Sequence, residues 1–215
     1  MFKNLKDIRC VERKTTISYK IIVIVGFLIL GILLGVLSKH LDCTASNELP
    51  YIVQLLDIRN FFSRFAIWVL IALDISVYSN SPVEAGMNVF AFFLGMVSSY
   101  YWYSNYVAGF FPKSYAVIWF GMTLITPLMA YVCWYAKGTS KVSFSLSAMI
   151  IAVLFNMTFV YGWIYFEMYS LLELLVFICG LAVLKRNTIK DSIMMTAMGI
   201  VLAFVLNLLV PFYYG

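Results

Sequence analysis

Charged residues and histidine are scarce in this sequence. Only 12% of its 215 residues are Asp, Glu, Lys or Arg, and it has one histidine, His40. One histidine cannot build a histidine-based metal cluster, and the H-E-x-x-H, G-x-S-x-G and P-loop spacings are absent. We therefore expect no metal, no other cofactor and no enzymatic activity, although a mechanism that uses only the carboxylates of Asp74 or Glu173 stays open.

The few cysteines also exclude a class of protein. Four thiols in 215 residues, at Cys10, Cys43, Cys133 and Cys179, are too few and too scattered for a disulfide-stapled scaffold or a zinc site. We expect all four to be free.

Apolar residues are abundant instead. They make up 63% of the chain, and the mean hydropathy is +0.93. This composition leaves too little polar surface to coat a water-soluble domain, so it predicts a membrane protein.

Seven apolar windows follow one another along the chain. A helix rises about 1.5 Å per residue, so some twenty apolar residues cross the hydrocarbon of a bilayer. The windows are Ile21 to Ser38, Phe65 to Ser79, Ala85 to Tyr106, Tyr115 to Ala136, Val142 to Gly162, Met168 to Leu184 and Ile193 to Phe212. The second window contains Asp74, so hydropathy alone also allows six spans.

The basic residues favour the count of seven. Lys and Arg accumulate in cytoplasmic loops. With seven spans and a cytoplasmic N-terminus, eleven of the fifteen Lys and Arg residues lie inside; without the second span only seven do. The expected fold class is therefore all-α, a polytopic transmembrane helix bundle with its N-terminus in the cytoplasm and its C-terminus outside.

The domain organisation is simple. Residues 1–20 are predicted to form a basic cytoplasmic leader, and residues 21–215 a single transmembrane helical domain. After the first span, Ser46 or Asn47 could cap a short helix with Pro50 in its first turn, lying at the outer interface.

Small residues at helical spacing mark the expected packing faces. The first span carries Gly31, Gly35 and Ser38, and the last carries Gly199 and Ala203. Helix packing within the bundle explains both stripes, and docking of a partner membrane protein on the first span is the alternative.

Glu173 is the candidate binding residue. It lies between leucines in the sixth window, where a lipid-facing carboxylate is costly, so we expect it to face the bundle interior. Arg64 or Lys113 could neutralise it, and a structural ion pair competes evenly with a binding site. An outward-facing pocket would add Glu167 and aromatic rings, which suit a flat or cationic solute: Tyr100, Tyr101, Trp102, Tyr103, Tyr106 and Trp163.

Three segments carry a resemblance. They are YSNSPVEAGMNVFAFFLGM (Tyr78 to Met96), GFFPKSYAVIWFGM (Gly109 to Met122) and WYAKG (Trp134 to Gly138), and they resemble an uncharacterised family of small multispanning membrane proteins of Gram-positive bacteria. This resemblance implies the bacterial plasma membrane. In size and density of spans the chain is also similar to the substrate-binding subunits of energy-coupling-factor transporters, whose first helix meets the coupling subunit through small residues.

The leading functional hypothesis is a multi-pass plasma-membrane protein that binds or transports a small solute through an outward-facing pocket. The alternatives are an accessory or scaffold subunit without cargo and an energy-coupling-factor-type substrate-binding subunit. Expected partners are membrane lipid, a small-molecule ligand and a membrane protein at the first span. The net charge of +5 comes from basic residues in the predicted cytoplasmic segments that flank the spans, where they meet anionic lipid headgroups. We therefore expect the chain not to bind nucleic acid.

Overall fold

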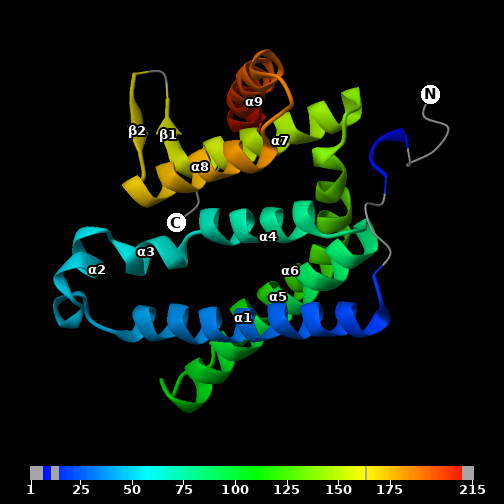
Figure 1. The fold of residues 1–215 in the computed structure, drawn as a ribbon. Helices are drawn as coiled ribbons and strands as arrows, with labels where there is room; N and C mark the ends of the chain where they lie inside the picture. Colours follow the sequence, from blue (N-terminus) through cyan, green and yellow to red (C-terminus); the bar gives the residue numbers. More distant parts are fainter. Residues whose placement is uncertain (1–6, 11–14, 163, 210–215) are drawn as a thin grey trace.

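A computed structural model describes residues 7–10, 15–162 and 164–209 of the chain. Helices make up almost all of this structure (Figure 1). The longer helices are α1 (Ile17–Cys43), α4 (Ala66–Tyr78), α5 (Pro82–Tyr106), α6 (Lys113–Trp134), α7 (Lys141–Thr158), α8 (Leu171–Leu184) and α9 (Ile189–Leu209). The short elements are η2 (Ser46–Glu48), α2 (Tyr51–Leu55), α3 (Ile58–Ser63), η3 (Tyr135–Lys137) and the strands β1 (Phe159–Tyr161) and β2 (Phe166–Met168).

Hydroxyl side chains define where the long helices begin. The first backbone N–H groups of a helix lack partners within it, and a Ser or Thr directly before the helix can accept one of them. Thr16 does so for α1, Ser81 for α5, Ser140 for α7 and Ser170 for α8. Pro82 then occupies the first position of α5, where a missing N–H has no cost.

Each of the seven apolar windows corresponds to one of the longer helices, but not all of these helices are long and apolar enough to cross a bilayer. Within the described residues, four helices are long and apolar enough to cross a membrane: α1, α6 with η3, α7 and α9. They indicate a membrane-embedded protein. The predicted count of seven is not supported, because α5 is long enough but not apolar enough, and because α4 has only 13 residues and α8 only 14. Helices of that length reach only about 20 Å, against roughly 30 Å of hydrocarbon.

Two interruptions shorten these helices. Asp57 has a left-handed backbone (φ 52°) between α2 and α3, and Arg64 is extended between α3 and α4, so the predicted interfacial helix is broken into pieces. Between α7 and α8 the chain forms an antiparallel hairpin that pairs Phe159 with Met168 and Tyr161 with Phe166. The sequence analysis did not predict this hairpin.

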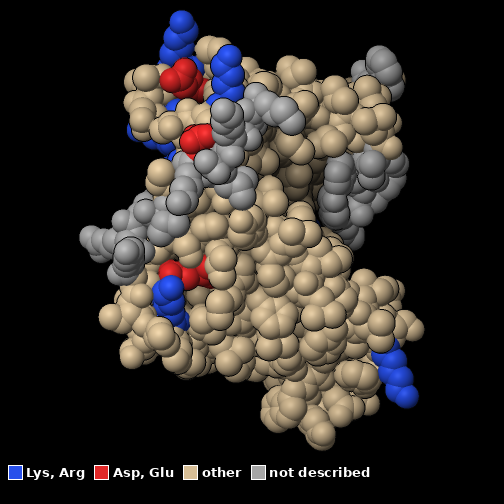
Figure 2. All heavy atoms as spheres, turned by 90° about the vertical axis from the view of Figure 1, so that its right-hand side faces the viewer, with Lys and Arg blue, Asp and Glu red and all other residues tan. Residues whose placement is uncertain are grey.

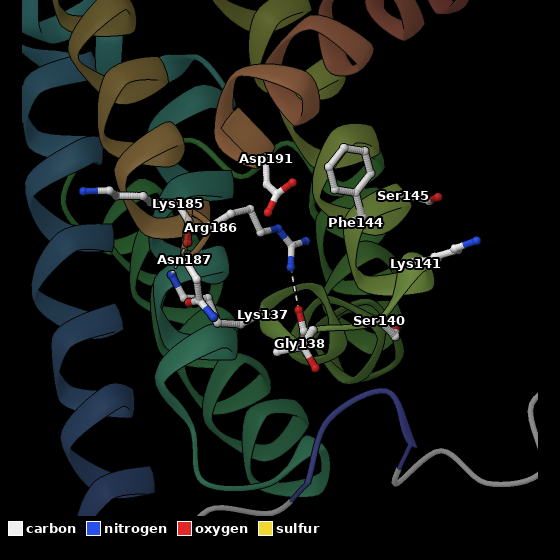
Figure 3. A pocket seen from close by; sticks show the side chains of 11 residues that line it. Lys137, Gly138, Ser140, Lys141, Phe144, Ser145, Lys185, Arg186, Asn187 and Asp191 are labelled. Carbon is white, nitrogen blue, oxygen red and sulfur yellow. Dashed lines mark hydrogen bonds between the residues drawn. The ribbon is translucent and has the colours of Figure 1, made fainter. Parts of the chain in front are cut away.

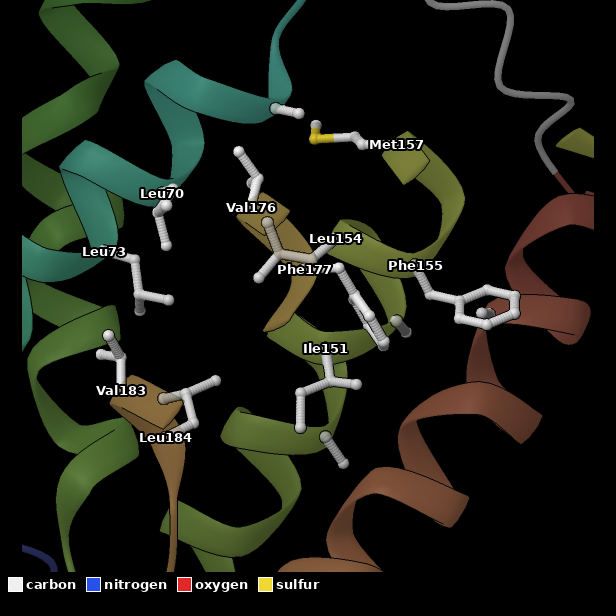
Figure 4. Close-up of a cluster of buried hydrophobic side chains, with 14 of the residues drawn as sticks. Leu70, Leu73, Ile151, Leu154, Phe155, Met157, Val176, Phe177, Val183 and Leu184 are labelled. Atoms are coloured by element: carbon white, nitrogen blue, oxygen red, sulfur yellow. The ribbon is translucent and has the colours of Figure 1, made fainter. Parts of the chain in front are cut away.

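The helices pack into two groups that share α4. On one side α1, α5 and α6 pack together, and on the other α7, α8 and α9 do. A large apolar cluster fills the second group and includes Leu73 of α4, Ile151 and Leu154 of α7, and Leu184 of α8 (Figure 4).

One end of the molecule gathers the helix ends that carry basic residues. The Arg9 guanidinium donates from Nη1 to the carbonyl of Val77 at the end of α4 (3.0 Å) and to that of Trp134 at the end of α6 (2.8 Å). The start of α1, the α4–α5 junction and the start of α7 lie on the same side, to the right in Figure 1. Figure 2 looks at this basic end, where Lys and Arg gather near the top of the view above a largely uncharged surface.

Candidate functional site

Glu173 lies in the first turn of α8 and has no exposed surface. Its Oε1 accepts a hydrogen bond from Nη1 of Arg64 at 2.6 Å, and its Oε2 accepts one from the hydroxyl of Ser170. The Arg64 guanidinium also contacts Asp57 (3.3 Å) and lies 5.4 Å from the ring centre of Tyr169. Both oxygens of the Glu173 carboxylate are therefore occupied by groups of the protein itself.

This cluster holds together the irregular parts of the fold. Arg64 is the extended residue between α3 and α4, Ser170 caps α8, and Thr158 at the end of α7 donates to the Glu173 carbonyl at 3.2 Å. Non-helical backbone at membrane depth is tolerated only where its polar groups find partners inside the protein. Of the two counter-charges considered from the sequence, the structure selects Arg64.

The other predicted pocket residues do not gather around Glu173. Glu167 lies on β2 and is exposed, and Trp163 lies outside the described residues. The rings of residues 100–106 belong to α5, which packs against α1 and α6 on the opposite side of α4 from the α7–α8–α9 group. Neither of the two pockets described below is lined by Glu173 or by these rings.

The rings on α5 have contacts of their own. The hydroxyl of Tyr100 donates to Asp42 at 3.2 Å and also accepts from Lys39. The Tyr103 hydroxyl lies 3.0 Å from Nδ1 of His40, and Tyr101 is buried against Phe111 and Phe120. Trp102 and Tyr106 are exposed, as expected for interfacial aromatic residues.

The small-residue stripes lie inside the helix packing. Gly31 and Gly35 of α1 contact the backbone carbonyls of Phe92 and Met96 on α5 so closely that neither position has room for a Cβ atom. Ser38 is also buried. On α9, Gly199 contacts Ile151, and the carbonyl of fully buried Ala203 accepts from Asn156 at 3.1 Å. In the structure α5 covers this face of α1, and docking of a partner membrane protein on the first span stays a prediction.

A pocket of about 440 Å³ lies at the basic end, between the α6–α7 and α8–α9 connections (Figure 3). Its lining carries four cationic side chains and one carboxylate: Lys137, Lys141, Lys185, Arg186 and Asp191. The rest of the lining is polar or small apart from Phe144, and it includes Gly138, Thr139, Ser140, Ser145 and Asn187.

Arg186 is the fixed centre of this pocket. Its guanidinium donates to the carbonyls of Ser143 (2.6 Å), Ala136 (3.1 Å) and Gly138, and to the hydroxyl of Ser147 (2.8 Å). Burial lowers the pKa of Arg186 below its ordinary value, and the charge of Asp191 offsets part of that effect. An arginine remains charged at neutral pH after such a shift, so it contributes a permanent positive charge.

The lysines around Arg186 differ in whether other residues hold their ammonium groups. The Lys137 ammonium donates to the carbonyls of Val183 and Lys185 and so ties η3, which follows α6, to the end of α8. Lys141 and Lys185 are exposed, and their side chains extend to opposite sides of the pocket in Figure 3. No hydrogen bond or ion pair to another described residue holds either ammonium group.

No protein-family model, curated protein or solved structure matches this chain. The resemblances noted from the sequence therefore stay predictions. Within the described residues there is also no group of three or more His, Cys, Asp or Glu side chains that could hold a metal ion.

The basic residues of this pocket are visible in the sequence, but their convergence in one site is not. Lys137 with Lys141, and Lys185 with Arg186 and Lys190, stand out as two basic connections. They were used to orient the chain in the membrane. That the two connections converge depends on α7 packing against both α8 and α9, which no local pattern reveals.

Proposed function

We propose that this chain is a multi-pass protein of a bacterial plasma membrane that binds an anionic, phosphate-bearing group at its cytoplasmic end. The observation that carries the proposal is the pocket of about 440 Å³ in which four cationic side chains face one carboxylate. The proposal keeps the small-ligand binding expected from the sequence, but it moves the site from the outer to the inner side.

The backbone around the pocket favours an anion as well. Helices α7 and α9 both begin at the pocket, and the N-terminus of a helix carries partial positive charge and free N–H groups. Ser140 accepts only one of the N–H groups of α7, from Ser143. The oxygens of a bound phosphate would accept hydrogen bonds from the remaining N–H groups at these helix N-termini.

The orientation follows from the same charges. Basic residues at the ends of spans favour the cytoplasmic side and attract anionic lipid headgroups there. The pocket would then lie at the inner membrane surface. Its ligand is either the headgroup phosphate of an anionic lipid or a free phosphorylated solute, and the two share the same recognition chemistry.

We do not include an outward-facing pocket at Glu173 in the proposal. The partners of its carboxylate are Arg64 and Ser170, so a ligand would have to displace a buried ion pair. A binding function also fits the lack of any catalytic motif better than an enzymatic one.

Binding should be measured on the full chain in nanodiscs, by calorimetry with inorganic pyrophosphate and by exchange of phosphatidylglycerol into phosphatidylcholine discs. The test variant is Lys141→Gln with Lys185→Gln, because neither ammonium has a partner among the residues that the structure describes. We expect the variant to weaken binding of the phosphate-bearing ligand at least tenfold, which corresponds to about 1.4 kcal/mol or more.

The matched control is Lys113→Gln, an exposed lysine that does not line the pocket. Saturable binding of pyrophosphate alone indicates a soluble ligand, and preferential retention of phosphatidylglycerol alone indicates a lipid. If neither probe binds the parent chain, or if the control weakens binding as much as the pocket variant does, the proposal is wrong.

A further inference from the structure

A second cavity, of about 570 Å³, lies between the start of α1, the end of α4 and the start of α5. This volume is within the range of roughly 300–1,000 Å³ typical of small-molecule sites. The cavity differs from the basic pocket in both charge and polarity. Its lining carries two carboxylates, Asp74 and Glu84, and one lysine, Lys20, and most of its other side chains are apolar.

Glu84 is neutralised inside the protein. Its Oε1 lies 3.0 Å from the Lys20 ammonium and accepts from the Thr15 hydroxyl at 3.0 Å, and its Oε2 accepts from Asn80 at 3.2 Å. The one lysine of the cavity is therefore already paired.

Asp74 has no such partner. It lies on α4 one turn before the helix ends at Tyr78, and its carboxylate makes no hydrogen bond or ion pair with any described residue. A carboxylate in an apolar cavity near a membrane is unfavourable unless it is paired, hydrated or neutralised. Among the described residues, nothing compensates the negative charge of Asp74 in this cavity.

Most of the α1 side chains that line the cavity are hydrocarbon. Ile21, Ile24 and Phe27 of α1 line the cavity over nearly two turns of helix, and Ile21 belongs to the exposed apolar surface of α1. The rings of Tyr19 and Tyr78 also line it, and aromatic faces attract cations. The cavity therefore offers an anchor for positive charge beside a surface for an apolar chain.

From this geometry we infer that the cavity binds an amphiphilic organic cation. The ammonium group of the ligand pairs with Asp74, and its hydrocarbon chain lies along Ile21, Ile24 and Phe27 of α1. An inorganic cation would leave the hydrocarbon wall unused, and a neutral lipid chain would leave the carboxylate uncompensated. This site is independent of the basic pocket between the α6–α7 and α8–α9 connections, here called the anion pocket, since the two share no residue.

The test uses the full chain in phosphatidylcholine nanodiscs and radiolabelled dodecylammonium, with binding to empty discs subtracted. Unlabelled dodecanol, which has the same chain without the charge, is the competitor control. We expect saturable binding to the parent, no displacement by dodecanol and an affinity at least tenfold lower for Asp74→Asn. Ile24→Trp, which fills the cavity and keeps the carboxylate, should lower the affinity to a similar extent.

Asp191→Asn is the matched control, because it removes a carboxylate from the anion pocket and should bind dodecylammonium like the parent. Pyrophosphate binding by Asp74→Asn separates this inference from the proposed function, which predicts no change there. The inference is overturned if the parent binds no more than empty discs, if Asp74→Asn and Ile24→Trp both bind like the parent, or if dodecanol displaces the label.

Discussion

At the scale of single residues, Glu173 and Arg186 are satisfied by partners far away in the sequence. Glu173 takes its counter-charge from Arg64, 109 residues earlier, and Arg186 reaches the carbonyls of the α6–α7 connection. The sequence could show that Glu173 needed a partner inside the bundle. It could not choose between Arg64 and Lys113, because that choice depends on how α8 packs against α4.

The ion pair predicts an asymmetric response to mutation. Arg64→Met leaves a fully buried carboxylate without its charge partner, and breaking a buried pair in this way costs about 3–5 kcal/mol. Glu173→Gln should cost less, since the Arg64 side chain remains 18% exposed and keeps Asp57 as a partner. Reversible unfolding in mixed micelles measures both changes in the free energy of unfolding.

The double variant, Arg64→Met with Glu173→Met, is the internal check. It should be more stable than Arg64→Met alone, because no unpaired charge remains buried. Arg59→Gln serves as the control and should have little effect, because Arg59 is a partly exposed arginine on α3 that does not contact Glu173. Additive losses in the double variant would mean that the two side chains are not coupled.

At the scale of helices, the positions of the apolar windows were well predicted and the irregular segments were not. Helices α1, α6 and α9 match their windows closely because hydropathy and end caps act locally. The β1–β2 hairpin lies in aromatic sequence that hydropathy cannot distinguish from the end of a span. The Phe166 ring of β2 packs against Phe155 of α7 and against Phe159 of β1, so the hairpin is held by ring contacts within itself and with α7.

The glycines of α1 allow a matched comparison between two positions on one helix. A Cβ at Gly31 would collide with the Phe92 carbonyl of α5, whereas a Cβ at Gly26 would meet nothing within 4 Å. Gly31→Ala should therefore lower the free energy of unfolding by about 1–3 kcal/mol. Gly26→Ala should leave it unchanged or raise it by up to about 1 kcal/mol, because alanine favours the helix.

Reversible unfolding in mixed micelles is again the measurement for the two glycine variants. Equal effects at both positions would show that α1 does not meet α5 through this face. The small-residue stripe would then be free for the partner docking that the sequence also allowed.

At the scale of the whole molecule, the two ends differ in chemistry. The basic end holds the anion pocket and the paired Lys20 and Glu84, while the opposite end holds the broken α2–α3 segment, the hairpin and the Arg64–Glu173 pair. The sequence predicted this asymmetry from its distribution of Lys and Arg. It could not predict either cavity, since each forms where three or more helix ends meet.

Accessibility to an impermeant maleimide in whole cells tests the orientation. Cys10 and Cys43 flank α1, so in single-cysteine variants Cys43 should react from outside and Cys10 only after lysis. Asn187→Cys, at the anion pocket, should behave like Cys10, and Glu167→Cys, on the hairpin, like Cys43. This pattern follows because the helix ends at Val77 and Trp134 are tied to the N-terminal segment by Arg9. Labelling of Asn187→Cys in intact cells would place the anion pocket outside, where the positive charge could not serve as a cytoplasmic flank, and the orientation proposed for the chain would be wrong.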